Sequence, residues 1–161
     1  MTAAFEALPR LIRILAVLNL GLMAGFFFAF ANPTMPGLAR TDGPVFAAAM
    51  QSINLAVRNL PFFIAFAGPA ALAALAVLVA RPRWPWLMAL LCYGGAILVT
   101  ARLNIPINEA IALWDPAAPP ADWAERRDAW MQANWLRFAL TAAGFLAAVL
   151  GLPAGRLEAR R

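Results

Sequence analysis

Four long runs without a charged residue constrain this chain more than any other feature. They cover residues 14–31, 60–80, 84–101 and 138–155. A bilayer core of about 30 Å is crossed by about 20 apolar residues in a helix. Water is absent there, and the sequence lacks the alternating pattern of barrel strands, so each run must satisfy its backbone groups as a helix. The sequence therefore predicts an all-α fold, a four-helix transmembrane bundle, with residues 1–161 forming a single membrane domain.

Composition supports this class of protein and excludes several others. Apolar residues make up 63% of the chain and charged residues 13%, against roughly 45–50% and about 25% in soluble domains. The net charge of +5 is too scattered for a nucleic-acid surface, so we expect no nucleic-acid partner. With no histidine and only Cys92, histidine or cysteine metal sites, haem ligation and a disulfide within the chain are excluded. We expect no metal and no cofactor.

The first run is longer than the ~7–15-residue apolar segment of a signal peptide, so we interpret it as a span. Within it, Gly21 and Gly25 form a small-residue notch that suits close helix packing. The notch serves a helix pair inside the chain or a homo-oligomer, and the sequence does not choose between them.

Arginine distribution predicts the orientation in the membrane. The two termini and the short turn with Arg81 and Arg83 carry a net charge of +5, whereas the other side sums to zero. Positive charge favours the cytoplasmic side. We therefore expect an integral protein of a bacterial inner membrane with both termini in the cytoplasm and the lipid bilayer as its first partner.

Two long connections, 32–59 and 102–137, lie on the opposite side, and we expect their short amphipathic helices to form a cap. Residues 43–59 contain few helix breakers and place Gln51, Asn54 and Arg58 on one helical face. Long connections on one side are typical of functional regions.

The second connection holds two further predicted helices. Asn104 is expected to cap a short helix with Pro106 near its start and with Asn108 and Glu109 in its first turns. Asp122 is expected to open another polar helix that runs straight into the last span. On that helix Trp130, Asn134 and Arg137 share a face.

These polar faces have two interpretations. Amide and guanidinium groups at the lip of a membrane bundle are costly to bury without partners. They either bond one another and tie the cap to the bundle, or they form a polar rim for a hydrophobic small-molecule ligand that enters from the membrane. On the second interpretation the residues that bind the ligand are Asn54, Arg58, Asn104, Asn108 and Trp130.

At these residues the sequence resembles the anthrone-oxygenase-like integral membrane family, over nearly its whole length. The resemblance is carried by Gly25 to Phe30 with Pro33, Met50 to Asn54, Pro61 and Phe62, Thr100, Asn104 to Asn108, Trp130, Asn134 and Arg137. Asn-x-Pro-x-Asn followed by Trp-x-x-x-Asn-x-x-Arg is its most specific part. The resemblance implies a small four-helix protein of a family named for members implicated in oxidising anthrones to anthraquinones. It assigns no role to the matching residues.

One hypothesis is a cofactor-independent oxygenase. Glu109 would be the base, Arg137, Asn134 and Asn104 would stabilise an oxyanion, and Trp130 would lie against planar rings. The alternative for Glu109 is a solvated acid that complements a helix dipole. The alternative for the whole chain is a non-catalytic membrane protein that binds a lipid-like or quinone-like ligand or acts as an accessory subunit. A transporter is a weaker interpretation, because no charge interrupts any span.

Overall fold

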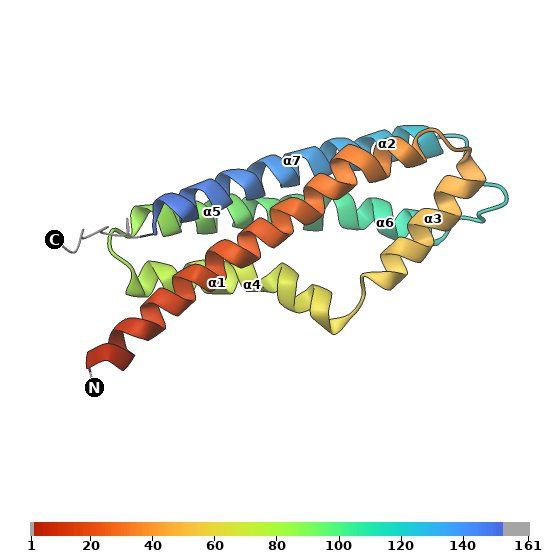
Figure 1. The fold of residues 1–161 in the computed structure, drawn as a ribbon. Coiled ribbons are helices and arrows are strands. Elements are labelled where there is room, and N and C mark those ends of the chain that lie inside the picture. Colours follow the sequence, from red (N-terminus) through yellow and green to blue (C-terminus); the bar gives the residue numbers. More distant parts are fainter. Residues whose placement is uncertain (1, 153–161) are drawn as a thin grey trace.

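The computed structural model describes residues 2–152, and side chains from residue 7 onward. Every regular element in this part is helical, and long helices run side by side (Figure 1). Four helical stretches are long and apolar enough to cross a membrane: Ala7–Leu38, Leu60–Val79, Trp84–Ala112 and Trp123–Leu150. The predicted four-helix membrane bundle is thereby confirmed, and the chain is an integral membrane protein.

Three of these stretches are longer than predicted. The first consists of α1 (Thr2–Ala29), η1 (Phe30–Thr34) and α2 (Met35–Leu38) in direct succession, and the third of α5 (Trp84–Val99), η2 (Thr100–Asn104) and α6 (Ile105–Ala112). The helices extend past the predicted spans 14–31 and 84–101. An uncharged run measures the apolar length, whereas backbone hydrogen bonding continues past it.

The last membrane helix, α7 (Trp123–Leu150), begins well before the predicted 138. Its polar first half continues into the apolar second half without a break, which confirms that the helix after Asp122 runs straight into the span. Residues 153–155 of the predicted span lie outside the described residues, as do Arg156, Arg160 and Arg161 of the charge argument.

Two wide helical turns, η1 and η2, interrupt the long helices in the half of the bundle away from the α4–α5 turn, which we call the outer half. They close with hydrogen bonds of π type, from the Met35 amide to the Phe30 carbonyl and from the Ile105 amide to the Thr100 carbonyl. Proline has no amide hydrogen for the regular bond. In η1, which contains Pro33, the Thr34 hydroxyl donates to the Ala29 carbonyl at 2.9 Å instead. Such turns are frequent at functional sites.

Asn104 does not cap a separate helix, so that prediction is wrong. It lies at the end of η2 in helical conformation and makes no capping bond. The reason is that α5, η2 and α6 form one continuous helix, so no free amide groups are left at Asn104 for a cap to satisfy.

The predicted helix over 43–59 is confirmed as α3 (Gly43–Ala56), with an Asp42 oxygen accepting from the Val45 amide. Asn59 then fixes the turn into α4 (Leu60–Val79) from both sides. Its oxygen accepts from the Phe62 amide at 2.9 Å, and its amide nitrogen donates to the Ala56 carbonyl at 2.7 Å. In Figure 1, α3 and the first turns of α4 form a bend at the end of the bundle that carries α2 and α6.

The inner half of the bundle, toward the α4–α5 turn, is packed through small residues. A Cβ added at Gly144 would lie 3.2 Å from the Ala89 carbonyl oxygen, so α7 and α5 are in close backbone contact. The Tyr93 hydroxyl donates to the Phe66 carbonyl at 2.7 Å. Gly21 faces the Phe145 ring inside the chain, whereas Gly25 has open space around it.

The cap has an apolar core of its own. Its buried members are Met35, Phe46, Met50, Ile111 and Trp130. Gln51 ties α3 to the end of α6 by donating to the carbonyls of Ile111 and Trp114, both at 2.9 Å. The two long connections therefore do pack together at one end of the bundle.

Candidate functional site

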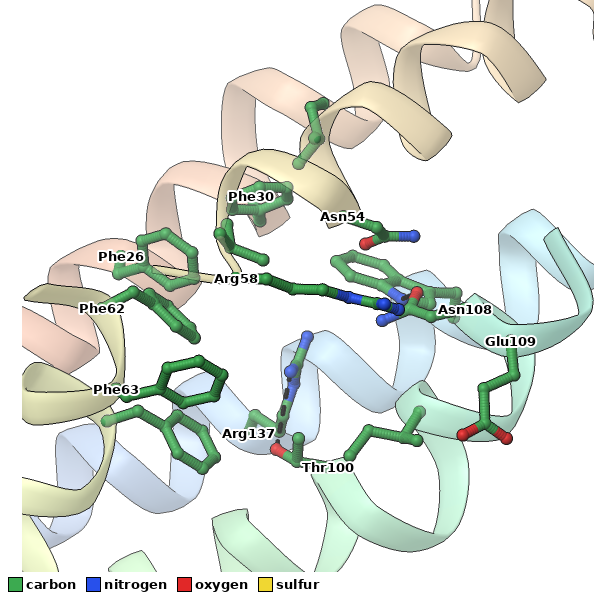
Figure 2. A pocket seen from close by; sticks show the side chains of 15 residues that line it. Phe26, Phe30, Asn54, Arg58, Phe62, Phe63, Thr100, Asn108, Glu109 and Arg137 are labelled. Atoms are coloured by element: carbon green, nitrogen blue, oxygen red, sulfur yellow. Dashed lines mark hydrogen bonds between the residues drawn. The ribbon is translucent and has the colours of Figure 1, made fainter. Parts of the chain in front are cut away.

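A cavity of about 300 Å³ lies between the cap and the outer half of the bundle. That volume is at the lower end of the range for small-molecule pockets, roughly 300–1,000 Å³. Every long helix and α3 contribute to its wall: the lining residues are Phe26, Phe30, Ile53, Asn54, Val57, Arg58, Phe62, Phe63, Phe66, Thr100, Ile105, Asn108, Glu109, Trp130 and Arg137. Figure 2 shows their side chains.

One side of the cavity is aromatic. Phe26 contacts Phe30 and Phe62, with ring centroids 5.1 and 5.3 Å apart, and Phe62 stacks on Phe66 at 5.8 Å. In Figure 2 the rings of Phe26, Phe62 and Phe63 lie on the side opposite Asn108 and Glu109. Phe63, which also lines the cavity, is 56% exposed. Ring faces of this kind suit an apolar, planar ligand.

The guanidinium group of Arg137 faces the cavity from α7, although only 7% of the residue is exposed. It lies over the ring of Phe27 at 4.6 Å and over the ring of Trp130 at 5.1 Å. No carboxylate forms an ion pair with it among the described residues, and its Nε atom has no hydrogen-bond partner there. Cation–π contacts thus stabilise a buried positive charge that no acid neutralises.

Asn134 and Thr100 hold Arg137 in place. The Asn134 oxygen accepts from Arg137 Nη2 at 2.8 Å, while its amide nitrogen donates to the Phe27 carbonyl at 3.0 Å. Thr100 is a longer contact, 3.5 Å from Arg137 Nη1. Asn134 is fully buried and does not line the cavity, so it is placed to orient the arginine rather than to touch a ligand.

Two asparagines of the Asn-x-Pro-x-Asn motif fix Trp130 from its two ends. Asn108 accepts from the indole Nε1 at 2.7 Å, and Asn104 donates to the Trp130 carbonyl at 3.2 Å. Asn108 lines the cavity, whereas Asn104 is fully buried behind it. The motif therefore docks the continuous α5–α6 helix onto α7.

Asn54, in the last turn of α3, and Arg58, in the turn after α3, both line the cavity. The amide nitrogen of Asn54 is buried without a hydrogen-bond partner among the described residues. Figure 2 shows the Arg58 side chain extending across the cavity, with the Arg137 side chain pointing toward it. No hydrogen bond or ion pair of the Arg58 guanidinium is formed within residues 2–152. Two guanidinium groups thus converge on one space.

Glu109 lies at the exposed edge of the cavity. In Figure 2 its carboxylate is turned away from the guanidinium groups of Arg58 and Arg137. No group of three or more His, Cys, Asp or Glu side chains is close enough to hold a metal ion in the described part of the chain. The charged groups of the lining are two guanidinium groups and this one carboxylate.

The structure brings six of the predicted site residues to the cavity: Asn54, Arg58, Asn108, Glu109, Trp130 and Arg137. It places Asn104 and Asn134 behind them. Sequence reasoning gave no role to the phenylalanines of α1 and α4 or to Thr100. Their signal was present as aromatic residues at helical spacing in residues 26–30 and 62–66, but lipid-facing packing produces the same pattern.

A family model described as anthrone oxygenase matches residues 50–147. The matched segment runs from the second half of α3 to most of α7 and includes both cavity arginines, whereas Phe26 and Phe30 lie before it. No curated protein and no solved structure matches the chain.

Proposed function

The chain belongs to the anthrone oxygenase family, and we propose that its cavity oxygenates a hydrophobic, hydroxylated polycyclic aromatic substrate without a cofactor. The observation that carries the proposal is the Arg137 guanidinium, buried, free of any acid among the described residues and directed into an aromatic-walled cavity.

An anthrone needs little from its catalyst. Its CH₂ group lies beside two aromatic rings and opposite a ketone, so loss of a proton leaves an electron-rich anion that can transfer an electron to O₂. Overall the CH₂ carbon becomes a carbonyl, one oxygen atom of O₂ enters it and the other leaves as water. A cation fixed in a dry site stabilises the anion and therefore the transition state. Arg137 supplies that cation, and Asn134 orients it.

Trp130 and the phenylalanines of α1 and α4 would hold the planar rings. Glu109 stays our prediction for the base: it lies at the cavity edge, from where a carboxylate can accept the proton directly or through water. Asn54, Arg58 and Asn108 would contact the substrate's oxygen atoms.

A second function is favoured by one observation, the orientation of Glu109 away from the arginines (Figure 2). Without a base, the same cavity would hold a quinone-like or lipid-like ligand and perform no chemistry. This non-catalytic binding protein is our alternative.

For its surroundings we propose a bacterial inner membrane with both termini in the cytoplasm, on the basis of the arginine distribution. The cavity then lies in the outer half of the bilayer, and its ligand arrives from the lipid. A homo-oligomer would use Gly25 rather than Gly21, because Gly21 already faces Phe145.

Oxygen uptake by the detergent-purified, metal-stripped protein with a hydroxylated anthrone tests the proposal. Heat-treated protein is the control, because anthrones also oxidise unaided. Uptake well above the control is expected, with Glu109→Gln lowering turnover about 100-fold or more and sparing substrate binding. Uptake equal to the heat-treated sample would remove the oxygenase proposal and leave the binding protein.

A further inference from the structure

We propose that the cavity binds its ligand as an oxyanion, with the charged oxygen held between Arg58, in the turn after α3, and Arg137 of α7. The inference rests on the proposed function for the kind of ligand, a planar aromatic phenol, and adds the form in which that ligand is bound and the residue pair that selects it.

The cavity lining carries more positive than negative charge. It contains two guanidinium groups and one carboxylate, and that carboxylate, Glu109, points away from both (Figure 2). The ion pairs found in the described residues use Arg126 and Arg127 instead. A buried cation without a counter-charge is costly in a low-dielectric site. A bound anion would remove that cost.

The side chains of the cavity wall have hydrogen-bond donors without a partner. Two buried side-chain atoms of cavity-lining residues have no hydrogen-bond partner among the described residues, Asn54 Nδ2 and Arg137 Nε. Both are donors. The one amide oxygen whose partner is known at the wall, Asn108 Oδ1, already accepts from Trp130. The guanidinium groups of Arg58 and Arg137 are likewise donors and have no carboxylate partner among the described residues, so a ligand between them must bring an acceptor. Hydrogen bonds to a charged acceptor are stronger than those to a neutral one, which favours an oxyanion.

The two cavity arginines come from different parts of the fold. Arg137 is fixed by Asn134 and by the Trp130 and Phe27 rings. Arg58 is exposed, extends across the cavity and makes no contact of its own to a carboxylate in residues 2–152. The rigid arginine provides the binding position, and the free one closes over the ligand from the cap.

Binding then ionises the ligand. The phenolic O–H bond breaks, the electron pair stays on the oxygen between the two guanidinium groups, and the proton passes to water at the exposed edge of the cavity. No oxidant or reductant takes part in this step. Two nearby cations favour the charged form, so the phenol ionises at lower pH in the cavity than in the micelle.

A dihydroxyanthraquinone dye, whose visible absorption shifts when a phenol ionises, reports this step without turnover. The dye is titrated with pH in detergent, with and without the purified full chain. We expect the protein to lower the apparent pKa of the bound dye by about one unit, which is tenfold in the ionisation constant. Arg58→Gln should abolish most of that shift. Arg102→Gln, which removes an exposed arginine of η2 outside the cavity lining, should retain it.

Arg58 is the main variant because it is exposed and its loss leaves the packing intact; Arg137→Gln, checked for folding by circular dichroism, is the second. Dye bound in its neutral form, or a shift unchanged in Arg58→Gln, would overturn the inference even if oxygen uptake were observed. Conversely, a shift that depends on Arg58 in a protein without oxygen uptake would support the oxyanion site while the oxygenase proposal falls.

A competition experiment against the bound dye separates the contribution of the ligand's charge from that of its apolar surface. Dodecanoate shares the charge but not the rings, and dodecanol shares only the chain. We expect dodecanoate to displace the dye at least tenfold more effectively than dodecanol. Equal displacement by both would show that apolar contact alone governs binding and would overturn the inference.

Discussion

The same helices run through both halves of the bundle, but they pack closely in the inner half and surround a cavity in the outer half. In the inner half buried alanines bring the helices together, among them Ala73, Ala76, Ala80, Ala89 and Ala148. In the outer half phenylalanine rings, two wide turns and a buried arginine surround a cavity. Small residues make contact between backbones, and large ones keep helices apart. The candidate site is therefore the region of the bundle in which the helices do not pack closely against one another.

Arg137→Gln should have the largest effect on oxygen uptake, and its effect should be limited to the outer half of the bundle. Loss of one donor from an oxyanion site costs about 10²–10³ in turnover. We therefore expect oxygen uptake with a hydroxylated anthrone to fall about 100-fold, while the inner half keeps its packing. Arg126→Gln, which removes an exposed arginine of α7, is the matched control and should leave uptake unchanged. Equal losses in both variants would contradict a specific role for Arg137.

Gly144→Leu should instead disrupt the packing of the inner half and lower the stability of the protein. A Cβ there already lies 3.2 Å from a backbone oxygen and 3.3 Å from Cys92, so the larger side chain must separate α5 from α7. Overpacking of this kind costs about 1–3 kcal/mol. Thermal unfolding in detergent measures the loss.

Gly94→Leu is its matched control on α5, since a Cβ at Gly94 meets nothing within 4 Å. Its unfolding temperature should stay at the wild-type value. If both variants unfold alike, close α5–α7 contact is not what holds the inner half together.

Asn134 lies where the inner and outer halves of the bundle meet, so Asn134→Ala should affect both. It removes the bond to the Phe27 carbonyl that joins α7 to α1 and the bond that orients Arg137. Loss of a buried hydrogen bond with an unsatisfied partner costs about 1–3 kcal/mol. We expect a lower unfolding temperature together with weaker dye binding. A drop in stability with dye affinity unchanged would separate packing from positioning and assign Asn134 to packing alone.

Asp122→Asn should have the smallest effect, a small change in the free energy of unfolding. Its ion pair with Arg126 is 2.7 Å long, but both side chains are 44% exposed. Exposed pairs contribute about 0–1 kcal/mol. A change of less than about 0.5 kcal/mol in the free energy of unfolding, measured in denaturant, is expected. A larger loss would show that this pair contributes more than its exposure predicts.

The fold was predictable because membrane helices leave a one-dimensional signal, a run of uncharged residues. Helix bounds were not, because α5 continues through Thr100 and Asn104 with the backbone bonded throughout. Arg137, Trp130 and Asn108 were found through their residue types and spacing. The roles of Asn104 and Asn134 behind the cavity were not predictable, because spacing along a helix does not reveal which neighbouring helix a side chain meets. The aromatic wall was hidden for the same reason, since Phe62 and a lipid-facing phenylalanine look alike in a sequence.

The wide turn η2 has a consequence for how such a protein can change over generations. A π turn holds one residue more than a regular turn, and one residue rotates everything after it by about 100° around the helix axis, given 3.6 residues per turn. In a regular stretch of helix, loss of one residue would therefore turn Asn108 and Glu109 away from the cavity. Within 100–104 the same loss would convert the wide turn into a regular one, so Asn108 and Glu109 would keep facing the cavity. The chain can therefore lose one residue at this point without re-aiming the binding surface.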